Sequence, residues 1–168
     1  MLKKARKNGN LYFVLALGIM AILFYSSAQT YETQSQISLL ERVLSNEPFK
    51  ETLNNVSFKY ADDVVSIEEK GYFSFVEFFI RKLAHFGTYF LLSASFFLSL
   101  LPKIKVVGFA AFFSWLSATG YAGIDEFHQM LTQDRTPLFQ DVMLDSFGAL
   151  TAILLCCLIF ARKKRRAL

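Results

Sequence analysis

The chain has only two cysteines among its 168 residues, only three prolines, and no stretch rich in proline, glycine or serine. Cys156 and Cys157 are adjacent, and neighbouring cysteines are poorly placed to form a disulfide with each other. We expect both thiols to pack as small apolar groups. Because neither a flexible linker nor an internal repeat is present, residues 1–168 are predicted to form one domain.

Motifs typical of hydrolases, nucleotide-binding proteins and metalloproteins are also missing. The sequence has no HExxH, no GxSxG, no Walker A loop and no cysteines at metal-ligand spacing. Its two histidines, His85 and His128, could bind a divalent ion together with carboxylates, but no fixed ligand spacing supports such a site. We therefore predict no metal site and no cofactor.

Apolar residues are abundant instead, since 54% of the chain is hydrophobic and 19 residues are phenylalanine. Four nearly continuous apolar runs cover residues 11–27, 83–101, 106–124 and 142–160. Each approaches the roughly 20 residues that a helix needs to cross a bilayer. None shows the alternating polarity of a strand in a membrane β-barrel. The predicted fold is all-α, a polytopic membrane protein with four transmembrane helices.

The distribution of charge predicts the orientation of these helices. Basic residues gather in residues 3–7, 103–105 and 162–166, whereas residues 28–80 hold nine Asp and Glu against four Lys and Arg. With four spans the three basic groups share one side, which the positive-inside rule makes cytoplasmic, so residues 28–80 are predicted to form an extracytoplasmic loop. The basic C-terminal tail has no aromatic neighbours or motif, so we expect it to contact anionic lipid and not nucleic acid.

The first apolar run leaves one alternative open. Basic residues, an apolar run and then Ser26-Ser27-Ala28 also resemble a secretory signal with a small-residue cleavage site. We favour an uncleaved first span. Cleavage would leave the other three spans unchanged.

Three segments of the long loop differ in their patterns. Ile37, Leu40 and Leu44 recur at helical spacing and predict a short amphipathic helix that ends before Pro48. Residues 50–70 are more polar, and we expect a loop with possible helix there. The aromatic run of residues 72–80 is expected at the level of the lipid headgroups, as a helix that continues into the second span.

Polar residues form stripes at helical spacing in three of the spans. The stripes are Glu77, Arg81, His85, Thr88 or Tyr89, and Ser93 in the second span, Ser114, Ser117, Tyr121, Asp125 and His128 in the third, and Asp141 and Asp145 in the fourth, followed by the small residues Gly148, Ala149 and Ala152. Thr136-Pro137 predicts the start of the fourth helix, with Thr as the N-cap.

Counting about 20 residues outward from the inner end of each span places one set of charged residues in the outer leaflet. These are Lys82, His85, Asp125, Glu126, His128, Arg135, Asp141 and Asp145. Since a charge at membrane depth is costly unless paired, we predict a shared pocket. In it His85, Glu126 or His128, Arg135 and Asp141 should cluster, with residues 30–47 or 72–80 as a rim.

Structural explanations compete with a functional one for several of these residues. Asp141 near a helix N-terminus suits the helix dipole. Arg81 and Lys82 could extend their charges to the headgroups, and His85 could simply pair with a carboxylate. Asp145 lies deeper and needs a proton or a cation, for which Arg135, Lys82 and His85 are the candidates.

Three stretches resemble the VanZ-like family of bacterial membrane proteins, which is named for a teicoplanin-resistance factor of Gram-positive bacteria. The stretches are FYSSAQTYETQSQIS, RKLAHFGTY and DEFHQMLTQDRTPLFQDVMLDSFGAL. The family pattern maps onto Lys82, His85, Tyr89, Asp125, Glu126, His128, Gln129, Arg135 and Asp141. The chain departs from many relatives at Gln133-Asp134, where they have Pro-Gly, and at Asp145, where they have Asn. The Ser-Ser-x-Gln segment resembles a family feature, which favours an uncleaved first span.

The resemblance implies an integral plasma-membrane protein linked to reduced susceptibility to teicoplanin-type lipoglycopeptide antibiotics. We predict that the family-pattern residues and Asp145 form a site for the drug or for a lipid-linked envelope component, with Lys82, His85 and Arg135 pairing with an anionic group. The alternative is an enzyme that modifies a lipid-linked envelope substrate, with His85 or Glu126 as general base and Arg135 stabilising negative charge. A transporter is disfavoured because the polar groups stop short of the inner leaflet.

Overall fold

Four long helices dominate the computed structural model, which describes residues 2–104, 106–133 and 137–166. They are α1 (Leu2–Ser27), α6 (Tyr72–Ile104), α7 (Val107–Gln133) and α8 (Phe139–Arg166). Each contains a segment long and apolar enough to cross a membrane. Those segments are Gly9–Ser27, Tyr72–Ile104, Val107–Leu131 and Phe139–Arg162. The four predicted helices are confirmed, and each is longer than the apolar run that predicted it.

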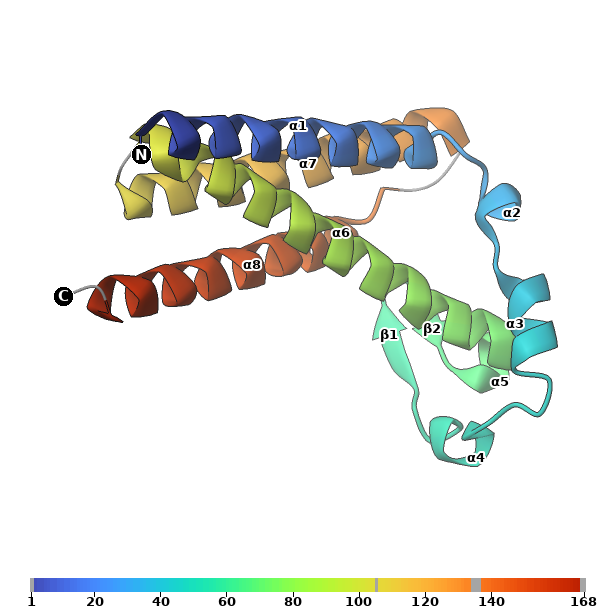
Figure 1. Ribbon diagram of the computed structural model, residues 1–168. Coiled ribbons are helices and arrows are strands. Elements are labelled where there is room, and N and C mark those ends of the chain that lie inside the picture. Colours follow the sequence, from blue (N-terminus) through green and yellow to red (C-terminus); the bar gives the residue numbers. More distant parts are fainter. Residues whose placement is uncertain (1, 105, 134–136, 167–168) are drawn as a thin grey trace.

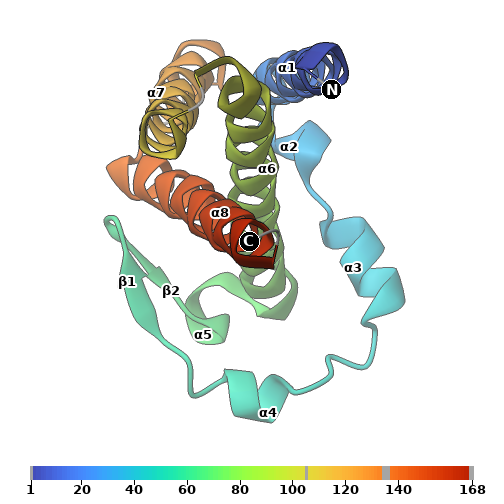
Figure 2. The same ribbon diagram turned by 60° about the vertical axis from the view of Figure 1, so that its left-hand side comes forward.

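Helix α6 is the centre of the bundle, because it packs against each of α1, α7 and α8 (Figure 2). The N-terminus, the C-terminus and the junction of α6 with α7 lie together at one end of the bundle (Figure 1). The ends of α1 and α7 lie at the opposite end, where the segment between α1 and α6 also extends beyond the bundle. Helices α6 and α8 therefore run in the same direction, and α1 and α7 run in the other.

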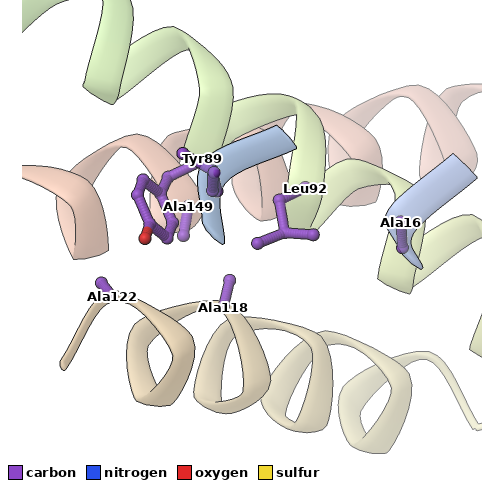
Figure 3. Packing of buried hydrophobic residues seen from close by; sticks show 7 residues of the cluster. Ala16, Tyr89, Leu92, Ala118, Ala122 and Ala149 are labelled. Carbon is purple, nitrogen blue, oxygen red and sulfur yellow. The ribbon is translucent and has the colours of Figure 1, made fainter. Parts of the chain in front are cut away.

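Small residues allow the four helices to approach closely. Around Tyr89 and Leu92 of α6, the buried neighbours are Ala16 of α1, Ala118 and Ala122 of α7 and Ala149 of α8 (Figure 3). Alanine at a helix contact brings the backbones near each other, which is how helices associate in lipid.

Gly148 marks the closest approach of α8 to α6. A Cβ atom at Gly148 would lie 2.4 Å from the backbone oxygen of Phe86. Ala149 and Ala152 next to it have no exposed surface. The predicted role of these small residues in close helix packing is thus confirmed.

The segment between α1 and α6 contains four short helices and a hairpin. The elements are α2 (Tyr31–Gln34), α3 (Ile37–Val43), α4 (Lys50–Leu53), β1 (Phe58–Tyr60), β2 (Asp63–Val65) and α5 (Ile67–Lys70). Helix α3 confirms the helix predicted before Pro48. Strands β1 and β2 pair antiparallel, with Phe58 opposite Val65 and Tyr60 opposite Asp63.

The hairpin corrects the prediction for residues 50–70, which was a loop with possible helix. Each strand has only three residues, too few to show an alternating pattern in the sequence. The hairpin is held by tertiary packing, since Val65 lies in a buried cluster with Ile67 and with Tyr72 and Phe75 of α6.

The beginnings of α6 and α8 differ in how well the sequence predicted them. Helix α6 begins at Tyr72, so the aromatic run is helical as expected. Helix α8 begins at Phe139, after the predicted Thr136-Pro137 start, and Thr136 lies outside the described residues. The carbonyl of Leu138 accepts bonds from the N–H groups of Asp141 and Val142, and the N–H of Leu138 donates to Glu126 Oε1 at 2.7 Å. A carboxylate from α7 therefore caps this helix.

Candidate ligand-binding cavity

A cavity of about 600 Å³ lies between α6, the start of α8 and the hairpin turn. Helix α6 contributes residues from Ser74 to His85, and α8 contributes Asp141, Leu144 and Asp145. Residues 60–63 of the hairpin turn form another wall, and Gln129 of α7 also lines the space. The cavity therefore joins the membrane helices to the segment that extends beyond them.

The middle of the cavity is organised around Asp141. Lys82 Nζ lies 2.5 Å from Asp141 Oδ1, and both side chains are about one-fifth exposed, at 23% and 22%. The hydroxyl of Tyr60 donates to the same carboxylate oxygen. The Lys82 ammonium also lies 4.8 Å from the ring centre of Tyr60 and 5.3 Å from that of Phe78. One carboxylate and two aromatic rings thus surround one ammonium group.

This arrangement raises the pKa of Tyr60. Burial of its ring, followed by its hydrogen bond to Asp141 and the negative charge of that carboxylate, raises the pKa of Tyr60 well above its usual value of 10.0. The phenol therefore stays protonated and remains a donor to Asp141.

A second pair, His85 and Asp145, forms the floor of the cavity. His85 Nδ1 lies 3.4 Å from Asp145 Oδ2, and the Asp145 side chain is only 6% exposed. Since α6 and α8 run in the same direction, this pair lies about one helical turn beyond Lys82 and Asp141, further into the bundle. The His85 ring stacks over that of Tyr89 with 6.5 Å between centroids. The other carboxylate oxygen of Asp145, Oδ1, has no hydrogen-bond partner within the described part of the chain.

The outer rim is built by the hairpin turn and the first turns of α6. Ala61 in the turn has φ +54°, a left-handed conformation that is rare for alanine. Asp63 of this turn pairs with Lys70 at 3.1 Å. Glu77 is almost fully buried and accepts a bond from the Gln36 N–H at 2.5 Å. The rim is thus tied both to α5 and to the segment before α3.

Five of the predicted site residues line this cavity. They are Lys82, His85, Gln129, Asp141 and Asp145. Arg135 lies outside the described residues. The remaining four, Tyr89, Asp125, Glu126 and His128, lie elsewhere in the described bundle. His85 and Asp141 therefore share one cavity as predicted, and Asp145 pairs with His85, one of the three partners predicted for it.

The polar stripe of α7 faces α1 and not the cavity, which corrects the predicted place of His128. Tyr121 donates to the carbonyl of Met20 at 2.6 Å, and His128 Nδ1 lies 2.7 Å from Ser27 Oγ. The His128 ring also stacks on Phe24 with centroids 4.2 Å apart. The stripe exists, but it joins two helices because α1 packs against that face of α7.

Glu126 and Asp125 likewise have roles within the bundle. Glu126 caps α8 through Leu138, so neither Glu126 nor His128 completes the cluster with His85 and Asp141. Asp125 is 4% exposed and accepts a bond from Gln129 Nε2 at 3.3 Å. Asp125 therefore does not line the cavity itself, but it contacts Gln129, which does.

The hairpin side of the cavity was not predicted from the sequence. Of the two predicted rims, residues 72–80 contribute Ser74, Glu77 and Phe78, whereas residues 30–47 do not line the space. Tyr60 and the neighbouring acids of the turn take that place. The only signal was an aromatic residue beside two acids, which is too common to indicate a site. Across the described residues, no group of three or more His, Cys, Asp or Glu is placed to hold a metal ion.

In a comparison with family models, residues 12–160 match the model described as VanZ/LLP1. Comparison with curated proteins and with solved structures finds no similar chain. The matched range includes every residue that lines the cavity.

Proposed function

This chain belongs to the VanZ/LLP1 family, and from this premise we propose that it is an integral protein of the plasma membrane of a Gram-positive bacterium that reduces susceptibility to teicoplanin-type lipoglycopeptides. The four helices of membrane-spanning length and composition support a multi-pass protein. The positive-inside rule supports cytoplasmic termini, which would put the cavity on the extracytoplasmic side.

The proposed activity is binding, and the cavity is the observation that carries this proposal. Its ligand would be the lipoglycopeptide or a lipid-linked component of the cell envelope. Lys82 and His85 would contact the ligand, while Asp141 and Asp145 hold them in place. Gln129 and Tyr60 would add hydrogen-bonding groups, and Arg135 remains a proposed cation of the same site. A volume of about 600 Å³ is within the usual range for a drug-sized ligand or a headgroup.

Substitution of the two bases tests the binding proposal. Lys82→Ala and His85→Ala should each lower teicoplanin resistance and reduce drug binding to membranes that contain equal amounts of protein. Lys103→Ala is the matched control, because Lys103 lies on the same helix at its other end, 5.3 Å from the ring of Phe13. Unchanged resistance together with unchanged binding in both cavity variants would contradict the proposal.

An enzyme remains the second candidate because of one observation, the histidine and carboxylate paired at the cavity floor. A carboxylate that orients an imidazole is typical of general acid–base catalysis. Glu126, the other base considered, is outside the cavity and caps α8. Lipids and cell-wall precursors should differ between cells with the wild-type protein and cells with His85→Gln if a reaction occurs. Identical profiles, when only the wild type confers resistance, would count against catalysis.

A further inference from the structure

The floor of the cavity contains a hydrogen-bond acceptor to which no described residue donates. Asp145 is 4% exposed and lines the cavity. Its Oδ2 faces His85 Nδ1 at 3.4 Å, but its Oδ1 has no hydrogen-bond partner among the residues that the structure describes. A buried carboxylate oxygen without a donor costs free energy, which a donor on a ligand would recover.

The neighbouring part of the cavity already accommodates an ammonium group. Lys82 places its Nζ beside Asp141, within 4.8 Å of the Tyr60 ring centre and 5.3 Å of the Phe78 ring centre. The two rings meet edge to face with 5.2 Å between their centroids. Aromatic faces and a carboxylate together stabilise a cation.

The charge of the lining also favours a cation. Among the described side chains that line the cavity, five carry carboxylates and three carry lysine or arginine cations, not counting His85. Two of the acids, Asp141 and Asp63, pair with Lys82 and Lys70. Among the described residues, the basic partner of Asp145 at the floor is the imidazole of His85, at the long distance of 3.4 Å.

We propose that the cavity floor at Asp145 is a subsite for a primary ammonium group, so that the ligand is an amphiphile whose headgroup carries a primary amine. This inference rests on the proposed function, in which the cavity binds a headgroup, and it names the chemistry of that headgroup. A primary ammonium supplies both the positive charge and the N–H donor that Asp145 Oδ1 requires. A quaternary ammonium supplies the charge without a donor, and a hydroxyl supplies a donor without the charge.

Three lipids with identical short acyl chains test the positive charge and the hydrogen-bond donor separately. Phosphatidylethanolamine has a primary ammonium, phosphatidylcholine has a quaternary one, and phosphatidylglycerol has hydroxyl donors and no cation. The full-length protein in detergent is mixed with equal amounts of the three, and retained lipid is counted by native mass spectrometry. We expect phosphatidylethanolamine to be retained at least about tenfold more tightly than either other lipid, which corresponds to about 1.4 kcal/mol.

Two variants show whether Asp145 causes the preference for phosphatidylethanolamine. Asp145→Asn should reduce the tenfold preference to about twofold or less, because the amide no longer offers a charged acceptor. Glu51→Gln is the control, since Glu51 is an exposed acid of α4 that does not line the cavity. That variant should keep the wild-type preference.

The outcomes distinguish this inference from the proposed function. Equal retention of the three lipids that is lost in Lys82→Ala would overturn the ammonium subsite and leave a headgroup site. Retention that neither Asp145→Asn nor Lys82→Ala alters would overturn both. Because the lipids are first compared on the unaltered protein, the test does not depend on Asp145→Asn folding correctly.

Discussion

Asp141 is the residue that connects the three parts of the cavity. It lies in the first turn of α8, its Oδ1 pairs with Lys82 of α6, and the same oxygen accepts the hydroxyl of Tyr60 from the hairpin. Without Tyr60, the hairpin turn would contact the membrane helices through fewer polar groups. The bond between Tyr60 and Asp141 is therefore the contact that we expect to fix the rim above the cavity.

Tyr60→Phe tests that contact by removing the hydroxyl and keeping the ring beside Lys82. At pH 8 the variant should be less stable by about 1 kcal/mol, the usual net contribution of one hydrogen bond. The folded protein raises the pKa of Tyr60 above 10.0, so the stabilisation is complete below pH 10 and declines as the pH rises further. Thermal unfolding from pH 8 to 11 should show the difference between the two proteins shrinking above pH 10.

The same pH series on Tyr25→Phe is the control, because Tyr25 is 70% exposed. Its melting temperature should follow the wild type throughout. A difference between wild type and Tyr60→Phe that grows above pH 10 would contradict the proposed contact.

At the residue scale, the partner of a buried charge was easier to predict from the sequence than the neighbouring helix that a polar stripe contacts. The pairing of Asp145 with a base, His85, followed from the cost of a lone charge at membrane depth. The predicted place of His128 was wrong. Helical spacing shows that residues share one face of a helix, but not which neighbouring helix that face contacts. Tyr60 was missed because residues far apart in the sequence, 60 and 141, meet only through the packing of the hairpin.

At the scale of elements, the contact between α6 and α8 sets the width of the cavity floor. Gly148 of α8 faces the Phe86 backbone of α6, one residue beyond His85. A larger residue at this position must move one helix relative to the other, because the atom that it meets belongs to the backbone.

Gly148→Ala should therefore destabilise the protein by roughly 1–3 kcal/mol, the usual cost of overpacking. Gly120→Ala in α7 is the matched control, since a Cβ there meets no atom within 4 Å. It should be neutral or slightly stabilising, because alanine is a better helix former than glycine. Melting temperatures in the same detergent compare the two, and equal stability of both variants would contradict the close approach of α6 and α8.

Long helices and short strands differed in how well the sequence predicted them. A run of about 20 apolar residues has few structural solutions in a membrane, so all four long helices were predictable. Strands β1 and β2 depend on each other and on the buried cluster around Val65 and Phe75, which no local pattern encodes. The start of α8 depends in the same way on Glu126 of another helix.

For the whole molecule, the bundle has two polar regions with different roles. Contacts between α1 and α7, through Ser27 and His128 and through Met20 and Tyr121, hold those two helices together. Contacts between α6 and α8 instead line an open space beneath the hairpin. Under the proposed function, the polar groups of α1 and α7 serve packing, and those that line the cavity serve binding.

The binding proposal depends on the orientation of the whole molecule in the membrane, which labelling of single cysteines can test. The basic groups of residues 3–7 and 162–166 lie at the end that holds both termini, and the positive-inside rule would make that end cytoplasmic (Figure 1). In a protein whose native cysteines are replaced by serine, Glu51→Cys in α4 should react with a membrane-impermeant maleimide in intact cells. Lys103→Cys at the end of α6 should react only after permeabilisation; both positions are exposed, so accessibility in the fold is matched. The reverse pattern would place the cavity on the cytoplasmic side, where a lipoglycopeptide acting outside the cell could not reach it.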